Sequence, residues 1–220
     1  LEKFPNLGGH KSGPYSYFCT SSDEGQEYVE SCAEHLFTNV PELGGMIGIN
    51  LGERPTHCYS ATQNLLHNNC PRCSKRTPAE VFAEMLGALQ RGMYRGNPNA
   101  ELVSWLYVPY LNYHGDEAAA AVKNEMVKIA ARIPPKVLLQ VNFESHGITS
   151  QWGRDHSILD YSLAYVGPSD VFADCANAAT AAGARVSAKL QVGNSHEVAT
   201  IPFMPVPGNL YRKYQKMREL

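Results

Sequence analysis

The sequence of 220 residues has no excess of either charge. Its 19 lysines and arginines are matched by 21 aspartates and glutamates, which leaves a formal net charge of −2. Nucleic-acid-binding domains carry a basic stripe, and polybasic membrane-surface proteins carry clusters of lysine and arginine. No apolar run reaches the roughly 18 residues of a transmembrane helix. We therefore expect no nucleic acid and no membrane among the partners.

The chain is also short of charge, with 18% charged residues against the roughly 25% usual in soluble domains. Hydrophobic residues make up 44%, which excludes disorder over most of the chain and supplies a core for one domain or two small ones. A starting methionine and a signal peptide are missing, and the chain ends at Leu220 inside a predicted helix. We expect a piece of a longer protein, so cytoplasmic and extracytoplasmic locations both stay open.

Two phosphate-binding motifs are missing as well: no Gly-x-Gly-x-x-Gly follows a predicted strand, and no Walker loop occurs. What is present is an alternation of helices and strands. The best-marked helix has Thr77 as N-cap, Pro78 as its first residue and Glu80 completing a capping box. Strands are predicted at 44–51, 102–108, 136–143 and 185–192. Their separation by helices predicts βαβ units and a parallel sheet.

Two architectures fit this pattern, an open doubly wound sheet and a closed (β/α)8 barrel. The missing nucleotide motifs weaken the first. Polar and aromatic residues at the predicted strand ends favour the second, because barrel active sites lie there. A whole barrel takes about 250 residues. The sequence therefore predicts an α/β chain, an incomplete TIM barrel over 1–220, with a cysteine-containing loop inserted at 53–76.

Two carboxylates follow predicted strands directly, where parallel α/β folds collect their functional residues. Glu53 follows the first strand and Glu144 the third. A partly desolvated carboxyl group can act as a general acid, and two carboxylates on one rim are the minimum for glycoside hydrolysis. We predict Glu53 and Glu144 as the catalytic pair. The alternatives are a loop ion pair of Glu53 with Arg54 or Arg72, and a Glu144 that faces solvent.

Other polar and aromatic residues at the same strand ends are predicted to bind the substrate, since aromatic rings stack on the apolar faces of sugars. They are Asn50, Arg54, Tyr107, Tyr110, Tyr113, His114, Asn142, His146, Trp152, His196 and Glu197. Trp105 and Tyr107 share one side of their strand, so both have the alternative of packing against helices. His114, His146 and His196 offer a catalytic metal site as a further alternative, although no His-x-His pair occurs.

The long polar loop after the first strand contains Cys70 and Cys73 at the C-x2-C spacing of structural zinc sites. Cys58 is a third candidate ligand, and His57 or His67 the fourth. A second knuckle is missing, so a disulfide of Cys58 or three free thiols remain alternatives. We predict a structural Zn²⁺ on the three cysteines and His67, and no cofactor for catalysis, because thiolate-rich sites are usually closed.

The run Ile49-Asn50-Leu51-Gly52-Glu53, followed by Cys58, resembles the signature of family 20 β-N-acetylhexosaminidases and related barrel glycosidases. Residues 18–22 are similar to the segment before the signature strand. The resemblance implies that the predicted strands are barrel strands four to seven and that Glu53 is the general acid.

The family's preceding aspartate, which orients the acetamido group of the substrate, matches Gly52 here. This departure leaves three alternatives: Glu144 takes the place of the aspartate, the substrate has no N-acetyl group, or this relative is not a hydrolase.

These observations predict a glycoside hydrolase-like domain that cleaves a carbohydrate by carboxylate general acid/base catalysis. The alternatives are a metal-dependent barrel hydrolase that uses the three histidines and a non-catalytic carbohydrate-binding relative. A nearly neutral chain with aromatics and carboxylates at its strand ends suits an uncharged polar ligand such as a sugar.

Overall fold

The computed structural model describes residues 3–108, 116–193, 201 and 203–220. Its strands are β1 (Gly8–Ser12), β2 (Tyr15–Phe18), β3 (Gly45–Leu51), β4 (Glu101–Leu106), β5 (Val137–Asn142), β6 (Ile148–Gln151), β7 (Arg154–Ser157) and β8 (Arg185–Lys189). Its α-helices are α1 (Asp23–Asn39), α2 (Pro78–Gly96), α3 (Asp116–Ala130), α4 (Asp170–Ala181) and α5 (Pro207–Arg218). Short 3-10 turns lie at Pro5–Leu7, Thr62–Leu65 and Cys73–Lys75.

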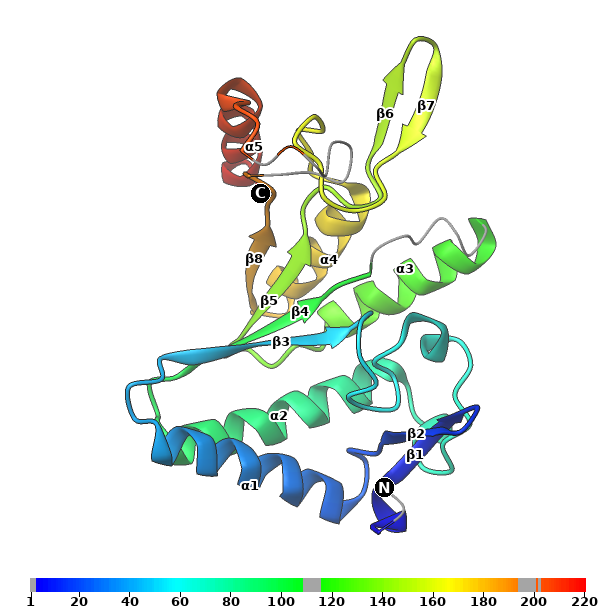
Figure 1. The fold of residues 1–220 in the computed structure, drawn as a ribbon, viewed down its shortest axis with the longest axis vertical. Coiled ribbons are helices and arrows are strands. Elements are labelled where there is room, and N and C mark those ends of the chain that lie inside the picture. Colours follow the sequence, from blue (N-terminus) through cyan, green and yellow to red (C-terminus); the bar gives the residue numbers. More distant parts are fainter. Residues whose placement is uncertain (1–2, 109–115, 194–200, 202) are drawn as a thin grey trace.

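The centre of the fold is a parallel sheet of four strands in the order β3-β4-β5-β8, which is also their order in the chain (Figure 1). These are the four strands that the sequence predicts, and their bounds differ from the predicted ones by a few residues. Two antiparallel hairpins, β1–β2 and β6–β7, are separate sheets.

The prediction of a (β/α)8 TIM barrel is wrong, because the sheet is open. In the described part of the chain, β3 and β8 are the two edges of the sheet and do not pair with each other. The βα alternation is the same in an open sheet and in a barrel. Closure depends on the number, tilt and stagger of the strands, which local sequence patterns do not determine.

Helix α2 begins as the sequence predicts. The Thr77 hydroxyl oxygen accepts the N–H of Glu80, and the Glu80 carboxylate accepts the N–H of Thr77, which completes the capping box around Pro78. These bonds satisfy N–H groups that have no partner within the helix. Helix α1 lies along α2 (Figure 1).

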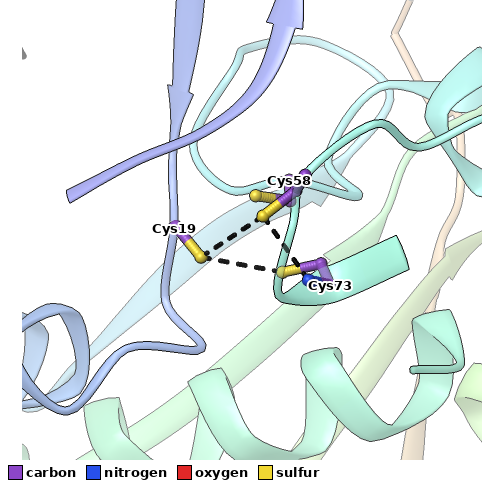
Figure 2. A group of neighbouring side chains, drawn as sticks. Cys19, Cys58 and Cys73 are labelled. Atoms are coloured by element: carbon purple, nitrogen blue, oxygen red, sulfur yellow. Dashed lines mark hydrogen bonds between the residues drawn. The ribbon is translucent and has the colours of Figure 1, made fainter. Parts of the chain in front are cut away.

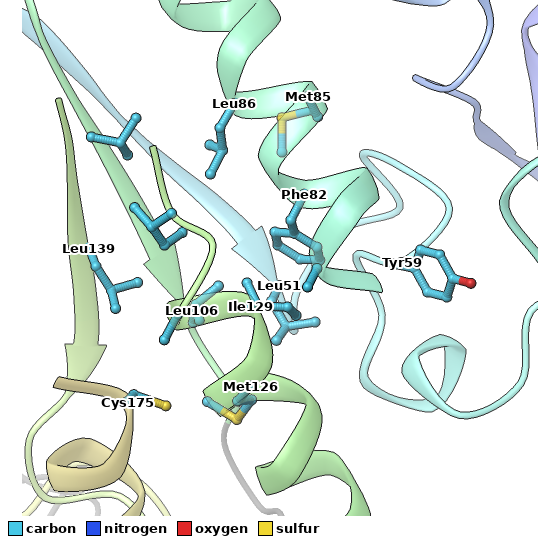
Figure 3. Packing of buried hydrophobic residues seen from close by; sticks show 14 of the residues in the cluster. Leu51, Tyr59, Phe82, Met85, Leu86, Leu106, Met126, Ile129, Leu139 and Cys175 are labelled. Carbon is cyan, nitrogen blue, oxygen red and sulfur yellow. The ribbon is translucent and has the colours of Figure 1, made fainter. Parts of the chain in front are cut away.

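One face of the sheet is covered by helices and contains the core. The three crossovers run the same way along the sheet, so right-handed connections place α2, α3 and α4 on one side. Leu106 of β4 and Leu139 of β5 belong to one buried cluster with Phe82 of α2 and with Met126 and Ile129 of α3 (Figure 3). The core thus fixes the strands and leaves their carboxyl ends to carry polar groups.

The other face of the sheet has a different character. Trp105, Gln140 and Ser187 lie in register across β4, β5 and β8 on this face, and Ile47 of β3 is 63% exposed on it. At the carboxyl ends of β4 and β5, this face carries polar and aromatic side chains, among them Trp105, Tyr107 and Asn142. No helix in the described ranges has both the length and the apolar character needed to cross a lipid bilayer.

Candidate functional site

Four cysteines meet beside the loop that follows β3. This four-cysteine cluster consists of Cys19, Cys58, Cys70 and Cys73 (Figure 2 labels three of them). Their sulfur atoms all lie within 4.8 Å of one another, and all four side chains are fully buried. Cys19 follows β2, Cys58 lies in the loop after β3, and the other two flank the start of a 3-10 turn. The cluster thus joins the hairpin β1–β2 to the loop.

The geometry of the cluster fits a metal ion. The Cys19 sulfur lies 3.7 Å from the sulfurs of Cys70 and Cys73, and all four thiols are free. A tetrahedral site with metal–sulfur bonds of about 2.3 Å has sulfur–sulfur separations of about 3.8 Å. Thiolates are ligands for soft and borderline metals. The four buried cysteines are therefore close enough, and of the right chemistry, to bind a metal ion.

N–H groups of the protein point at the sulfur atoms. Arg72 Nε donates to Cys19 Sγ at 3.2 Å and the backbone of His10 donates to Cys58 Sγ at 3.4 Å. Hydrogen bonds from Cys58 and Cys73 lower the pKa of Cys19, and Arg72 adds to this effect. Hydrogen bonds with Cys19 and Cys73, followed by burial, raise the pKa of Cys58. The N–H donors also favour the thiolate form that a metal needs.

Three of the four predicted ligands meet in the cluster, and the fourth does not. Cys58, Cys70 and Cys73 lie together. His67 is exposed and lies outside the cluster, and Cys19 takes its place. Cys19 precedes the loop by a whole helix and strand, so no spacing motif marks it as a ligand.

A second group of side chains lies at the carboxyl ends of the strands, and we call it the carboxyl edge. Its members are Trp105, Tyr107, Asn142, Asp160, Tyr161 and Lys189. Asp160 is its polar centre: its carboxylate accepts hydrogen bonds from Tyr107 Oη at 2.6 Å, Asn142 Nδ2 at 2.9 Å and Ser145 Oγ at 3.1 Å. Burial, followed by the bond to Asp160, raises the pKa of Tyr107. Asp160 thereby fixes residues that follow different strands.

Aromatic rings form the outer part of the carboxyl edge. The Trp105 and Tyr107 rings are 5.1 Å apart, and Tyr107 stacks on Tyr161 at 6.2 Å. Trp105 Nε1 donates to the side chain of Asn142 at 2.9 Å, and the Lys189 ammonium lies 4.1 Å from the centre of the Tyr161 ring. Trp105, Tyr161 and Lys189 are partly exposed.

Glu144, the second predicted catalytic carboxylate, is enclosed by protein. Its Oε1 atom is 2.5 Å from Lys213 Nζ and accepts the N–H of Gln191 at 2.9 Å, and the side chains of Glu144 and Lys213 are 0% exposed. Burial raises the pKa of Glu144, and the charge of Lys213 opposes that rise. Lys213 also donates to the carbonyl of Ser162. This arrangement ties α5 to the sheet and keeps substrate away from Glu144.

Glu53, the first predicted catalytic carboxylate, is exposed in the loop after β3. Burial and the charge of Asp160 raise the pKa of Tyr161, and the charge of Glu53 adds to that rise. The preceding Gly52 has φ +101°, and a Cβ atom there would lie 1.5 Å from the carbonyl oxygen of Tyr107. An aspartate therefore cannot occupy position 52 in this loop conformation.

The other predicted substrate-binding residues are spread over the molecule. Asn50 is buried, and its side chain accepts the hydroxyl of Ser104. Arg54 is exposed. His146 is buried, with Nε2 2.5 Å from the carbonyl of Val108. Trp152 is 95% exposed at the tip of the hairpin β6–β7, which projects from the sheet (Figure 1). The remaining five, Tyr110, Tyr113, His114, His196 and Glu197, lie outside the described residues.

Sequence reasoning missed Asp160, Tyr161, Lys189 and Lys213. Of these four, only Lys189 is marked by a sequence pattern, because it is a polar residue near the end of the predicted strand 185–192. Comparisons with protein families, curated proteins and solved structures found no match for this chain.

Proposed function

We propose that the chain is a glycoside hydrolase-like domain whose carboxyl edge binds a carbohydrate and whose Glu53 is the general acid. The observation that carries the proposal is where an exposed carboxylate stands in the chain: Glu53 follows Gly52, which packs against the backbone of Tyr107, and the Tyr107 ring stacks on the partly exposed ring of Tyr161. Aromatic faces with a few placed polar groups are typical of sugar and other small-ligand sites.

The residues of the edge have separate roles in this proposal. Trp105 and Tyr161 stack on the sugar, Lys189 offers a polar contact beside them, and the buried Asn142 holds Trp105 in place. Glu53 donates its proton to the oxygen of the leaving group. Asp160 is a positioning residue, because its carboxylate is buried and holds Tyr107. We assign Glu144 a structural role through Lys213.

The proposal is tested with Glu53→Gln, which keeps the size of the side chain and removes its charge and acid. We expect hydrolysis of chromogenic glycosides to fall by about 10²-fold or more. Glu42→Gln is the matched control, because Glu42 is an exposed glutamate before β3, at the opposite end of the strands. Activity that survives Glu53→Gln at the level of Glu42→Gln would refute the assignment.

A second candidate function is carbohydrate binding without turnover. It is favoured by the burial of Glu144, which leaves Glu53 as the exposed member of the predicted carboxylate pair. Intrinsic fluorescence of Trp105 reports binding at the edge. Sugar-dependent quenching that is lost in Trp105→Phe, together with no turnover by the unaltered chain, would favour this function over hydrolysis. Trp152→Phe controls for the other tryptophan of the chain.

The metal of the four-cysteine cluster is a structural Zn²⁺ in this proposal. Four thiolates fill a tetrahedral Zn²⁺ and leave no position for substrate. The Zn²⁺ would hold together a loop whose regular elements are two short 3-10 turns. Elemental analysis of the purified chain should give about one zinc per chain, and Cys32→Ser, which alters an exposed cysteine outside the cluster, should not change that ratio.

A further inference from the structure

The segment 52–60 connects the end of β3 to the four-cysteine cluster, and it carries Glu53. At one end, the N–H of Gly52 donates to the carbonyl of Ser60 at 2.7 Å. At the other end, Cys58 belongs to the cluster. The segment contains no helix or strand, so its shape depends on these two attachments and on the side chains between them.

His57 provides the main side-chain contact between the cluster and the sheet. Its ring is 1% exposed and packs edge-on against Phe82 of α2. Nε2 lies 2.9 Å from the carbonyl oxygen of Asn50, and Nδ1 accepts the N–H of Tyr59 at 3.2 Å. Since a carbonyl only accepts, Nε2 carries the proton, and the ring is a neutral bridge between β3 and the residue after Cys58.

The cluster side of the segment is held by further bonds. The carbonyl of Cys58 accepts the amide groups of Asn64 at 3.1 Å and Asn68 at 2.8 Å. Tyr59 Oη donates to the carbonyl of Cys73 at 2.9 Å. These bonds converge on residues that ligate the metal or neighbour a ligand, so displacement of Cys58 would disturb them together.

We infer that the metal of the four-cysteine cluster fixes the 52–60 segment, and that His57 is the positioning residue through which it holds Glu53 at the carboxyl edge. The effect on sugar binding rests on the proposed function. The fixing of segment 52–60 by the metal does not depend on it. The cluster would then control the affinity of a site to which it contributes no ligand.

Hydrogen exchange tests the structural part without any sugar. In the zinc-loaded chain, we expect the amides of Gly52, Tyr59 and Ser60 to be protected, because each is hydrogen-bonded. Removal of zinc by a chelator should speed their exchange by about tenfold or more. Exchange rates in 52–60 that do not respond to zinc would overturn the inference.

Three histidine variants separate positioning from metal binding. His57→Ala should keep one zinc per chain, since His57 is not a ligand, yet lose protection in 52–60 by about tenfold. His57→Gln should restore much of it, because its amide can donate to the Asn50 carbonyl. His35→Ala is the control, at an exposed histidine of α1. Protection that is unchanged in His57→Ala, or zinc lost together with it, would overturn the positioning role.

Sugar binding then decides the functional part. His57→Ala should weaken sugar affinity several-fold with zinc still bound, while His35→Ala should not. Protection that responds to zinc in a chain that binds no sugar would refute the proposed function and leave the structural inference standing. Sugar binding that ignores both zinc and His57 would refute the inference and leave the proposed function standing.

Discussion

The four-cysteine cluster and the carboxyl edge are ordered by different means. The cluster lies in a long loop with only 3-10 turns, and its buried groups are four thiols whose shared partner would be a metal ion. The carboxyl edge is attached to the sheet, and its buried Asp160 accepts hydrogen bonds from side chains of the chain itself; the buried Glu144, which follows β5, is paired with Lys213. A chelator should therefore loosen the cluster and the segment that carries Glu53, and leave the hydrogen bonds of Asp160 in place.

The largest loss of stability is expected from a variant that can no longer bind the metal. Cys73→Ser removes one of four thiolates, and because metal-binding free energy is also folding free energy, we expect the free energy of unfolding to fall by more than about 4 kcal/mol. Zinc content should fall well below one per chain, and thermal unfolding should begin at lower temperature. Cys32→Ser is the control for effects that any cysteine replacement would have. If the two variants are equally stable, the loop does not depend on a metal for its stability.

The next largest effect is expected from breaking the buried ion pair between Glu144 and Lys213. Lys213→Met leaves Glu144 buried without its cation, and the loss of one partner of a buried ion pair costs about 3–5 kcal/mol. Lys213 is also the buried residue of α5, so this helix should detach. Denaturant unfolding measures the change, and zinc content should stay that of the unaltered chain.

The double variant Lys213→Met, Glu144→Gln distinguishes an unpaired charge from lost packing. It should recover a large part of the stability, because no buried charge is then left without a partner. A double variant no more stable than Lys213→Met alone would show that the ion pair is not the source of the effect.

The sequence predicts those parts of the fold that depend on local pattern. Thr77, Pro78 and Glu80 mark the start of α2, and the apolar runs locate the four strands of the sheet. Whether the sheet closes is decided by strand number, tilt and stagger. These are properties of the whole chain. The positions of the strands could therefore be predicted from the sequence, whereas the prediction of a barrel was wrong.

In the candidate site, too, local patterns can be predicted and long-range contacts cannot. Cys70 and Cys73 can be recognised in the sequence because a metal knuckle needs a fixed short spacing. Cys19 reaches them through pairing of the hairpin β1–β2 with the loop, where Asn69 exchanges hydrogen bonds with the backbone of Lys11. Such pairing has no spacing rule.

The buried carboxylates Asp160 and Glu144 are harder still to place from the sequence. Asp160 accepts a hydrogen bond from Tyr107, which precedes it by 53 positions in the chain. Glu144 is bonded to Lys213, which follows it by 69 positions. No local pattern sets those distances. A strand-end rule can therefore name Glu144 as a candidate, but it cannot foresee that Lys213 encloses it.

The smallest effect tests how much of the edge depends on Asp160. Tyr107→Phe removes one donor to Asp160 and leaves the carboxylate bonded to Asn142 and Ser145. A hydrogen bond to a charged group contributes about 1.5–3 kcal/mol, so the unfolding free energy should fall by that amount and by less than in Lys213→Met. Tyr15→Phe is the control, because that ring is 73% exposed. Exchange in 52–60 should not change, since Gly52 packs against the backbone of Tyr107 and not its hydroxyl. If that exchange does speed up, the two regions are coupled through Tyr107, and the separation between a metal-ordered loop and a self-ordered edge fails.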